Sequence, residues 1–182
     1  MKQLFDIIFS MIALIIFALP MAIISLVLKL KERHKIFFKQ DRVGKNKVIF
    51  KILKFQSMVG NVPTQTGRLL RKTGLDELPQ FINVLLGEMS IVGPRALTEF
   101  DIERLHWDDK FHERRWNSKP GITGFAQIYG GQHKKTSWFW DKFYINKNNV
   151  LIDFGIVMIS FLMNIFGKTI IRKLVFRKNS LK

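Results

Sequence analysis

Two neighbouring carboxylates, Asp76 and Glu77, lie in the segment TGLDELPQ (73–80) of a chain whose formal net charge is +16. Arg71 and Lys72 come shortly before them. Neighbouring positions of a helix point roughly 100° apart, so the two acids are not expected to share a proton. They could instead divide two tasks, in which one attacks an electrophile and the other holds a metal ion or a proton.

The basic surroundings of the two acids favour phosphoryl transfer. A carboxylate at a helix N-terminus beside arginines is expected to have a lowered pKa. An ionised carboxylate is a workable nucleophile on phosphorus. Mg²⁺, held by one or two carboxylates and substrate phosphates, would cancel the repulsion between them. Arg71 and Arg95 could add bidentate contacts to phosphate oxygens.

A structural role for the same acids is also open from the sequence. Thr73 and Asp76 have the spacing of a capping box, and Pro79 would be tolerated at a helix start. In this interpretation the chain is a non-enzymatic, membrane-attached module. Its basic face would then bind anionic lipid or an assembly partner.

Composition narrows the class of partner. The 30 Lys and Arg residues against 14 Asp and Glu indicate an anionic partner. Hydrophobic residues make up 47% of the chain, with 17 Phe, which favours a membrane surface or a phosphorylated substrate over nucleic acid. There is no cysteine, so disulfides and thiol chemistry are excluded.

An N-terminal membrane anchor is predicted from residues 7–28, which carry no charge. As a helix this segment would be roughly 33 Å long, against a bilayer core of about 30 Å. Lys29 and Lys31 follow it, and this basic flank should stay cytoplasmic. Pro20 removes a backbone hydrogen bond and bends the helix. From this segment alone, a membrane span and a re-entrant hairpin both remain open.

The rest of the chain predicts a mixed α+β fold that is mainly helical. We expect a β-hairpin over 37–55, a helix over 68–87 ending at Gly87, and a helix over 96–118. A glycine-punctuated loop with one short strand should follow. The apolar stretch 150–166 fits either a core helix or a membrane-embedded one. The tail 168–182 mixes basic and apolar residues, as is typical of a helix in the headgroup region.

Three motifs together resemble one known family. They are DRVGKNKVIFKILKFQSM (41–58), GRLLRKTGLDELPQFINVLLGEMSIVGPRAL (67–97) and KPGITGFAQIYG (119–130). Their combination is similar to that of bacterial sugar transferases known as monotopic phosphoglycosyl transferases. The resemblance implies transfer of a sugar-1-phosphate from a UDP-sugar to a polyprenyl phosphate, usually undecaprenyl phosphate, with release of UMP.

The resemblance also implies roles for individual residues. Asp76 would be the nucleophile that forms a covalent phosphosugar intermediate, and Glu77 would bind Mg²⁺. Substrate-binding roles fall on Lys54, Arg71, Arg95 and Gln127.

The resemblance further implies a re-entrant helix broken at Pro20, cytosolic catalytic helices and interfacial amphipathic helices. The expected regions are 1–35 in the membrane, 36–149 for catalysis, and 150–182 at the membrane. The site would be the cytoplasmic face of a bacterial inner membrane, and a homo-oligomer is compatible with the sequence. Larger relatives carry additional transmembrane helices, and we expect this chain to suffice for the transfer by itself.

Three departures from the family pattern bear on substrate preference. Leu19 precedes Pro20 where the family often has serine, Gly131 stands in place of an arginine, and Gln56 replaces a basic residue. The sequence therefore predicts a reaction class and leaves the sugar open.

Overall fold

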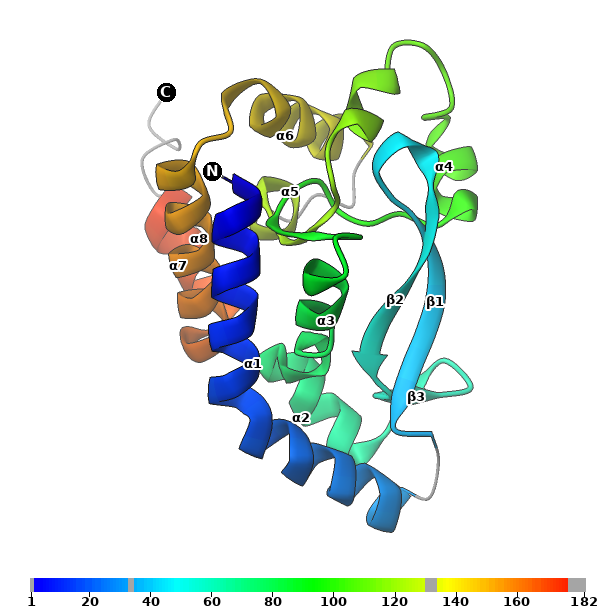
Figure 1. Cartoon of the computed structure of the whole chain (residues 1–182), viewed down its shortest axis with the longest axis vertical. Coiled ribbons are helices and arrows are strands. Elements are labelled where there is room, and N and C mark those ends of the chain that lie inside the picture. The colour runs from blue at the N-terminus through cyan, green and yellow to red at the C-terminus, as the bar shows by residue number, and fades with distance from the viewer. Residues whose placement is uncertain (1, 33–34, 130–133, 177–182) are drawn as a thin grey trace.

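The computed structural model describes residues 2–32, 35–129 and 134–176, without the side chains of 134–136 and 173–176. Helices dominate, as predicted, and the strands are short (Figure 1). Helix α1 (Lys2–Val27) packs on α3 (Gln80–Leu85), and α3 packs on strand β2 (Ile49–Phe55). Figure 1 accordingly shows α3 between the N-terminal helix and the β-hairpin.

The predicted membrane anchor forms one long helix. Over the described residues, the segment Lys2–Glu32, which is α1 and a following π-turn (Leu28–Glu32), is the one helix long and apolar enough to cross a membrane. Only 11% of its most apolar window is buried inside the protein. Pro20 lies inside α1 without ending it, and Figure 1 shows this helix bent partway along its length. A bend is the expected effect of a missing backbone hydrogen bond. The re-entrant path through the membrane stays a prediction.

The predicted apolar helix over 150–166 is confirmed as α7 (Val150–Phe166). It is neither wholly core nor wholly exposed, because Asp153, Ile156 and Met163 are buried while the other side of the helix is open. Large apolar side chains recur at helical spacing on the exposed sides of both α1 and α7. They are Leu4, Ile8, Met11, Ile12, Ile15, Ile16, Leu19, Ile23 and Leu26 on α1, and Leu151, Phe154, Met158, Phe161 and Ile165 on α7.

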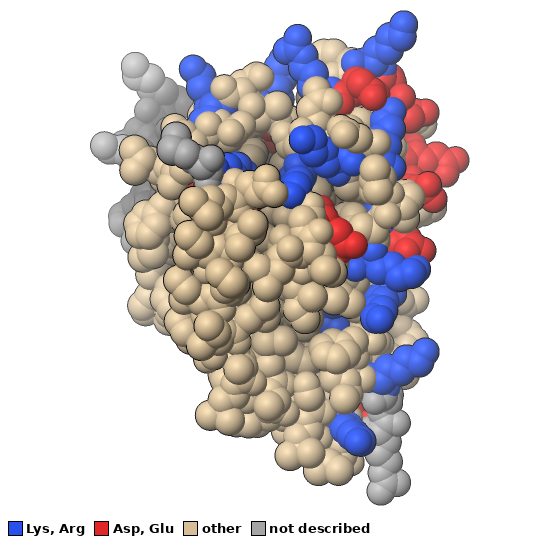
Figure 2. Space-filling view, viewed as in Figure 1, with Lys and Arg blue, Asp and Glu red and all other residues tan. Residues whose placement is uncertain are grey.

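We call these side chains the apolar face of the protein. Figure 2 shows a broad surface without charges over its lower left part, where Figure 1 places α1 and α7. An apolar surface of this extent is typical of contact with lipid. Helix α8 (Lys168–Phe176) follows α7. Its place in the headgroup region stays a prediction, and residues 177–182 lie outside the described part.

Buried carboxylates fasten α1 to the rest of the protein. Asp6, on α1, accepts hydrogen bonds from Ser90 Oγ at 2.7 Å and from the Ile91 amide at 3.0 Å. Lys2 Nζ donates to Asp153 Oδ2 on α7 at 2.6 Å, and Tyr144 OH donates to Asp153 Oδ1 at 2.7 Å. The three bonds that involve Asp6 or Lys2 join residues more than 80 positions apart in the chain. They therefore fix the start of α1 against the residues of β5 and against α7.

The predicted hairpin over 37–55 is confirmed. Strand β1 (Phe37–Val43) pairs antiparallel with β2, and the register runs from Phe37 opposite Phe55 to Val43 opposite Ile49. A second small hairpin joins β3 (Met58–Val59) to β4 (Val62–Pro63).

The prediction of a single helix over 68–87 was wrong. The segment divides into α2 (Gln65–Thr73), a 3-10 turn η3 (Leu75–Glu77) and α3. Gly74 ends α2 in the left-handed conformation, with φ of 73°, which glycine adopts without steric cost. Pro79 is the N-cap of α3, so the expectation of a proline at a helix start is confirmed. The break gives the two acids a short turn of their own.

The prediction of one helix over 96–118 was also wrong. Helix α4 covers Glu99–Leu105 and begins with a capping box between Thr98 and Asp101. It ends at His106, whose φ is 52°. A 3-10 turn η4 (Glu113–Asn117) comes later.

The expected short strand in the glycine-punctuated loop is confirmed. It is β6 (Gly121–Thr123), which pairs in parallel with β5 (Ser90–Val92). Helices α5 (Phe125–Ile128) and α6 (Lys134–Lys147) follow.

Candidate active site

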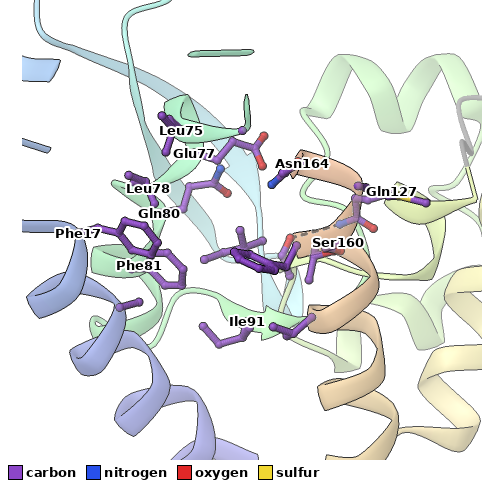
Figure 3. A pocket seen from close by; sticks show the side chains of 18 of the residues that line it. Phe17, Leu75, Glu77, Leu78, Gln80, Phe81, Ile91, Gln127, Ser160 and Asn164 are labelled. Atoms are coloured by element: carbon purple, nitrogen blue, oxygen red, sulfur yellow. Dashed lines mark hydrogen bonds between the residues drawn. The ribbon is translucent and has the colours of Figure 1, made fainter. Parts of the chain in front are cut away.

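A cavity of about 800 Å³ lies between α1, α7, β2 and the η3–α3 segment. Four of the predicted site residues line it, namely Lys54, Glu77, Arg95 and Gln127. Figure 3 shows Glu77 and Gln80 on one side of this cavity and Asn164 and Gln127 on the other. The cavity therefore gathers side chains from four separate parts of the sequence.

Glu77 and Asp76 occupy different environments although they are neighbours. Glu77 faces the cavity, and its Oε1 accepts a hydrogen bond from Lys54 Nζ at 2.6 Å. Asp76 is only 6% exposed and, although it adjoins Glu77, is not among the residues that line the cavity. Burial raises the pKa of Asp76, and the charge of Glu77 raises it further, while Lys54 and Arg71 act in the opposite direction. The lowered pKa expected from the sequence was wrong, because loss of solvation outweighs the nearby cations.

The capping explanation for the acids was wrong as well. Thr73 ends α2, and its hydroxyl donates back to the carbonyls of Leu69 and Leu70. Among the described side chains, none caps η3 or α3 with a hydrogen bond. Within the described part of the chain, no hydrogen bond from another residue reaches the Asp76 carboxylate. A buried carboxylate left without such a bond is costly to the fold, and groups of this kind gather at functional sites.

The predicted arginines are placed differently from each other. Arg95 is exposed and lines the cavity. Arg71 is exposed on α2, where its NH1 contacts Met58 Sδ at 3.3 Å, and it does not line the cavity. Its charge nevertheless acts on the pKa of Asp76.

Sequence reasoning missed several cavity residues. They are Arg42, Gln80, Ser160, Asn164 and Lys168.

Arg42 could have been found by strand alternation. The register places Phe38 opposite Lys54 and Arg42 opposite Phe50, so Arg42 and Lys54 share one face of the hairpin. A polar residue inside the apolar run 150–166 was the available signal for Asn164. Ser160 and Lys168 carried no comparable signal.

The cavity also has an apolar wall from α1 and α7. Ile12, Ile16, Phe161 and Ile165 line it and are also exposed on the apolar face, each by more than half. The cavity therefore reaches the surface that we assign to lipid contact. A ligand with a charged head and a long apolar chain would match this arrangement.

The two acids are too few to hold Mg²⁺ by themselves and would need a substrate to complete the site. No group of three or more metal-ligating side chains occurs among the residues that the structure describes. One or two carboxylates completed by substrate phosphates and water is the usual arrangement for Mg²⁺ in proteins. Glu77, at the cavity wall, fits that role. Lys54 contacts one of its oxygens, so a metal ion would meet a residue already balanced by a cation.

The structure describes two of the three residues that depart from the family pattern. The Gln56 amide donates to the carbonyl of Met58, so it braces the connection between β2 and β3, and it does not line the cavity. Leu19 is exposed on α1, and α1 continues through Pro20. Gly131 lies outside the described residues.

Comparison with known proteins identifies the class. Residues 1–167 match the family model described as bacterial sugar transferase, so the chain belongs to that family. It is 35% identical over 144 residues to a UDP-N-acetylgalactosamine-undecaprenyl-phosphate N-acetylgalactosaminephosphotransferase of Aeromonas hydrophila, covering 71% of this chain and 34% of that one. It is 38% identical over 144 residues to a UDP-glucose:undecaprenyl-phosphate glucose-1-phosphate transferase of Escherichia coli, covering 71% and 31%.

A third relative is closer in length. The exopolysaccharide production protein PSS of Rhizobium leguminosarum bv. phaseoli is 38% identical over 149 residues, covering 71% of this chain and 74% of that one. The chain thus spans about a third of the first two relatives and most of the third. The relatives named for their sugars differ in the sugar, which agrees with a sequence that leaves it open.

Proposed function

We propose that this protein transfers a sugar-1-phosphate from a UDP-sugar to a polyprenyl phosphate such as undecaprenyl phosphate. The observation that carries the proposal is the cavity, whose cationic and carboxylate side adjoins an apolar wall open to the lipid-facing surface. A UDP-sugar offers a diphosphate to the cations. A polyprenyl phosphate offers a phosphate on a long apolar chain, which could enter between α1 and α7.

In the proposed reaction, an oxygen of the ionised Asp76 carboxylate attacks the phosphorus that carries the sugar. The bond from that phosphorus to the bridging oxygen breaks, and UMP leaves with this oxygen and its electron pair. A phosphate oxygen of the polyprenyl phosphate then attacks the same phosphorus. The bond to Asp76 breaks, the carboxylate is restored, and a polyprenyl-diphosphate sugar is formed.

The remaining side chains have supporting roles in this proposal. Arg95 and Lys54 would bind the phosphates, and Gln127 would bind a neutral part of the donor. Arg71 would act through the field that it exerts on Asp76. Glu77 would hold Mg²⁺, which would offset the negative charge of the phosphates when bound. We place the site at the cytoplasmic face of a bacterial inner membrane, because basic residues follow the anchor.

A trapping experiment tests the mechanism. The solubilised protein is incubated with Mg²⁺ and each of a panel of UDP-sugars, without acceptor, and analysed by intact-protein mass spectrometry. We expect UMP release in one equivalent and a mass increase of one phosphosugar on Asp76. Addition of undecaprenyl phosphate should remove the adduct and restart UMP release.

Two variants control the trapping experiment. Asp76→Asn should form no adduct, whereas Asp41→Asn should behave as wild type, because Asp41 is exposed and pairs with Lys51 on the hairpin. UMP release without an adduct, and equal in Asp76→Asn, would exclude Asp76 as the nucleophile. If none of the UDP-sugars gives UMP release, the non-enzymatic membrane module becomes the better interpretation.

A further inference from the structure

Arg115, in the η4 turn, is a charged side chain buried away from the cavity. Its side chain is 2% exposed, as is that of Asp141 on α6, and Arg115 Nε donates to Asp141 Oδ2 at 3.0 Å. A buried ion pair of this kind is often no better for stability than apolar residues of the same volume. Its presence therefore calls for a second reason.

The guanidinium of Arg115 is held in a fixed orientation. Its central carbon lies 5.4 Å from the ring centre of Trp107 and 4.9 Å from that of Trp116. Both tryptophans are buried. Aromatic rings and a carboxylate together restrain the planar guanidinium, which is more rigid than a lysine amine. A donor fixed in this way can fix whatever it binds.

A second nitrogen of this guanidinium reaches the backbone of a predicted substrate-binding residue. Arg115 NH2 donates to the backbone carbonyl of Arg95. Arg95 also forms an isolated parallel bridge with Gly121, and the carbonyl of Ala96 accepts a hydrogen bond from Arg42 NH1 at 3.0 Å. The backbone at Arg95 is therefore held from both sides, while its side chain extends into the cavity.

We propose that Arg115, clamped by Asp141, is a positioning residue that fixes the backbone at Arg95 and so directs the Arg95 guanidinium toward the diphosphate of the donor. Arg115 touches no substrate in this arrangement. The inference rests on the proposed function, since it assumes that Arg95 binds the phosphates. Its consequence is that the effect of Arg115 on donor binding passes through Arg95.

The competing explanation is purely structural. In that case the ion pair only attaches η4 to α6, and its loss would weaken the protein whether or not Arg95 is present. A double-mutant cycle separates the two explanations, because residues that act through one another are not additive.

The test uses the full chain in lipid nanodiscs, with Arg115→Lys made in the wild type and in Arg95→Ala. Lysine keeps the charge beside Asp141 but lacks the planar fork that also serves the Arg95 carbonyl. UDP affinity is measured by calorimetry, and KM and kcat are measured with the UDP-sugar. Arg114→Lys is the matched control, since Arg114 is the exposed neighbour of Arg115.

We expect Arg115→Lys to weaken UDP binding by about tenfold and to raise KM more than it lowers kcat. In the Arg95→Ala background the same change should alter UDP affinity less than about twofold. Arg114→Lys should match wild type. Equal losses in both backgrounds, or no loss in the wild type, would overturn the positioning role.

Asp141→Glu covers the case in which Arg115→Lys does not fold. It keeps the charge pair but displaces Arg115, and it should weaken UDP binding only while Arg95 is present. If the wild type binds no UDP, or if Arg95→Ala leaves binding unchanged, the phosphate role of Arg95 fails and the positioning role falls with it. If Arg95 matters but neither Arg115→Lys nor Asp141→Glu does, only the positioning role is refuted.

Discussion

Asp76 in the η3 turn and Asp153 on α7 are both buried carboxylates, and the protein treats them in opposite ways. Asp153 is 1% exposed and receives hydrogen bonds from Lys2 and Tyr144. Asp76 is 6% exposed and receives none from another residue in the described part of the chain. The difference lies in the partners and not in the depth.

This contrast separates architecture from chemistry. A buried charge that is fully paired fixes one element against another, as Asp153 and Asp6 fix α1. A buried carboxylate whose only hydrogen bond among the described residues comes from its own backbone amide, as in Asp76, opposes folding and is a candidate for chemistry. The same contrast yields experiments in which activity and stability move in different directions.

The largest expected effect is that of Asp76→Asn on transfer. Loss of the proposed nucleophile should lower the rate of UMP release by about a thousandfold or more. The same variant should be at least as stable as wild type at neutral pH, because a neutral amide is cheaper to bury than a carboxylate. UMP release and thermal unfolding in detergent would be measured on the same preparations. A variant that loses both activity and stability would place Asp76 with the structural carboxylates.

The next effect is that of Asp141→Asn on stability. This change leaves the buried guanidinium of Arg115 without its counter-charge, which should cost about 3–5 kcal/mol. Unfolding by denaturant in detergent micelles would measure the loss. Asp108→Asn is a control, because Asp108 is an exposed residue of the loop between α4 and η4. A loss below about 1 kcal/mol would mean that the pair is not isolated from water.

A smaller effect is expected where α1 meets α7. Asp153→Asn removes the negative charge and one of the two oxygens that accept from Lys2 and Tyr144, and it should cost about 1–3 kcal/mol. Lys2→Met should cost less than about 1 kcal/mol, because the Lys2 side chain is 34% exposed and water can replace part of the contact. Thermal unfolding of the two single variants would show whether this asymmetry holds. Equal losses would mean that the ion pair, and not the buried carboxylate, carries the attachment.

Local patterns predicted those elements that local physics determines. The hairpin over 37–55 and the helix over 150–166 follow from alternation and from a continuous apolar run. The helix over 68–87 did not form, because Gly74 permits a left-handed turn that apolar spacing does not register. The motif resemblance pointed to Lys54, Glu77, Arg95 and Gln127, and the structure places all four in the lining of one cavity.

Long-range packing explains what the sequence could not supply. The solvation of Asp76 depends on elements far away in the chain, so its raised pKa could not be read from neighbouring arginines. Asn164 lines the cavity because α7 lies against the α2–η3 junction, where the Asn164 amide is close to Gly74. Neither contact has a signature in local spacing.

The last prediction concerns pH and returns to Asp76. Burial first, and Glu77 second, raise the pKa of Asp76 above its ordinary value of 3.8. A nucleophile must be ionised, so kcat/KM should rise with pH along a limb that lies above 3.8, where the sequence alone would have placed it below. Glu77→Gln removes the second cause. Because Glu77 is also the proposed Mg²⁺ ligand, this variant should be less active overall, and the limb of its remaining activity should lie at lower pH. Steady-state UMP release across the acid range would measure this limb in the wild type and in Glu77→Gln. Circular dichroism would confirm that both proteins stay folded.

Ionisation of Asp76 should have the opposite effect on stability from its effect on activity. Because the folded-state pKa is raised, the Asp76 carboxyl favours folding below pH 3.8, and this contribution is lost as pH rises through the folded pKa. The stability gain of Asp76→Asn should therefore be present at neutral pH and disappear in acid. A gain that does not depend on pH would mean that shape and not charge distinguishes this carboxylate from Asp153. An activity limb below 3.8 would show that the nearby cations, Lys54 and Arg71, outweigh burial after all.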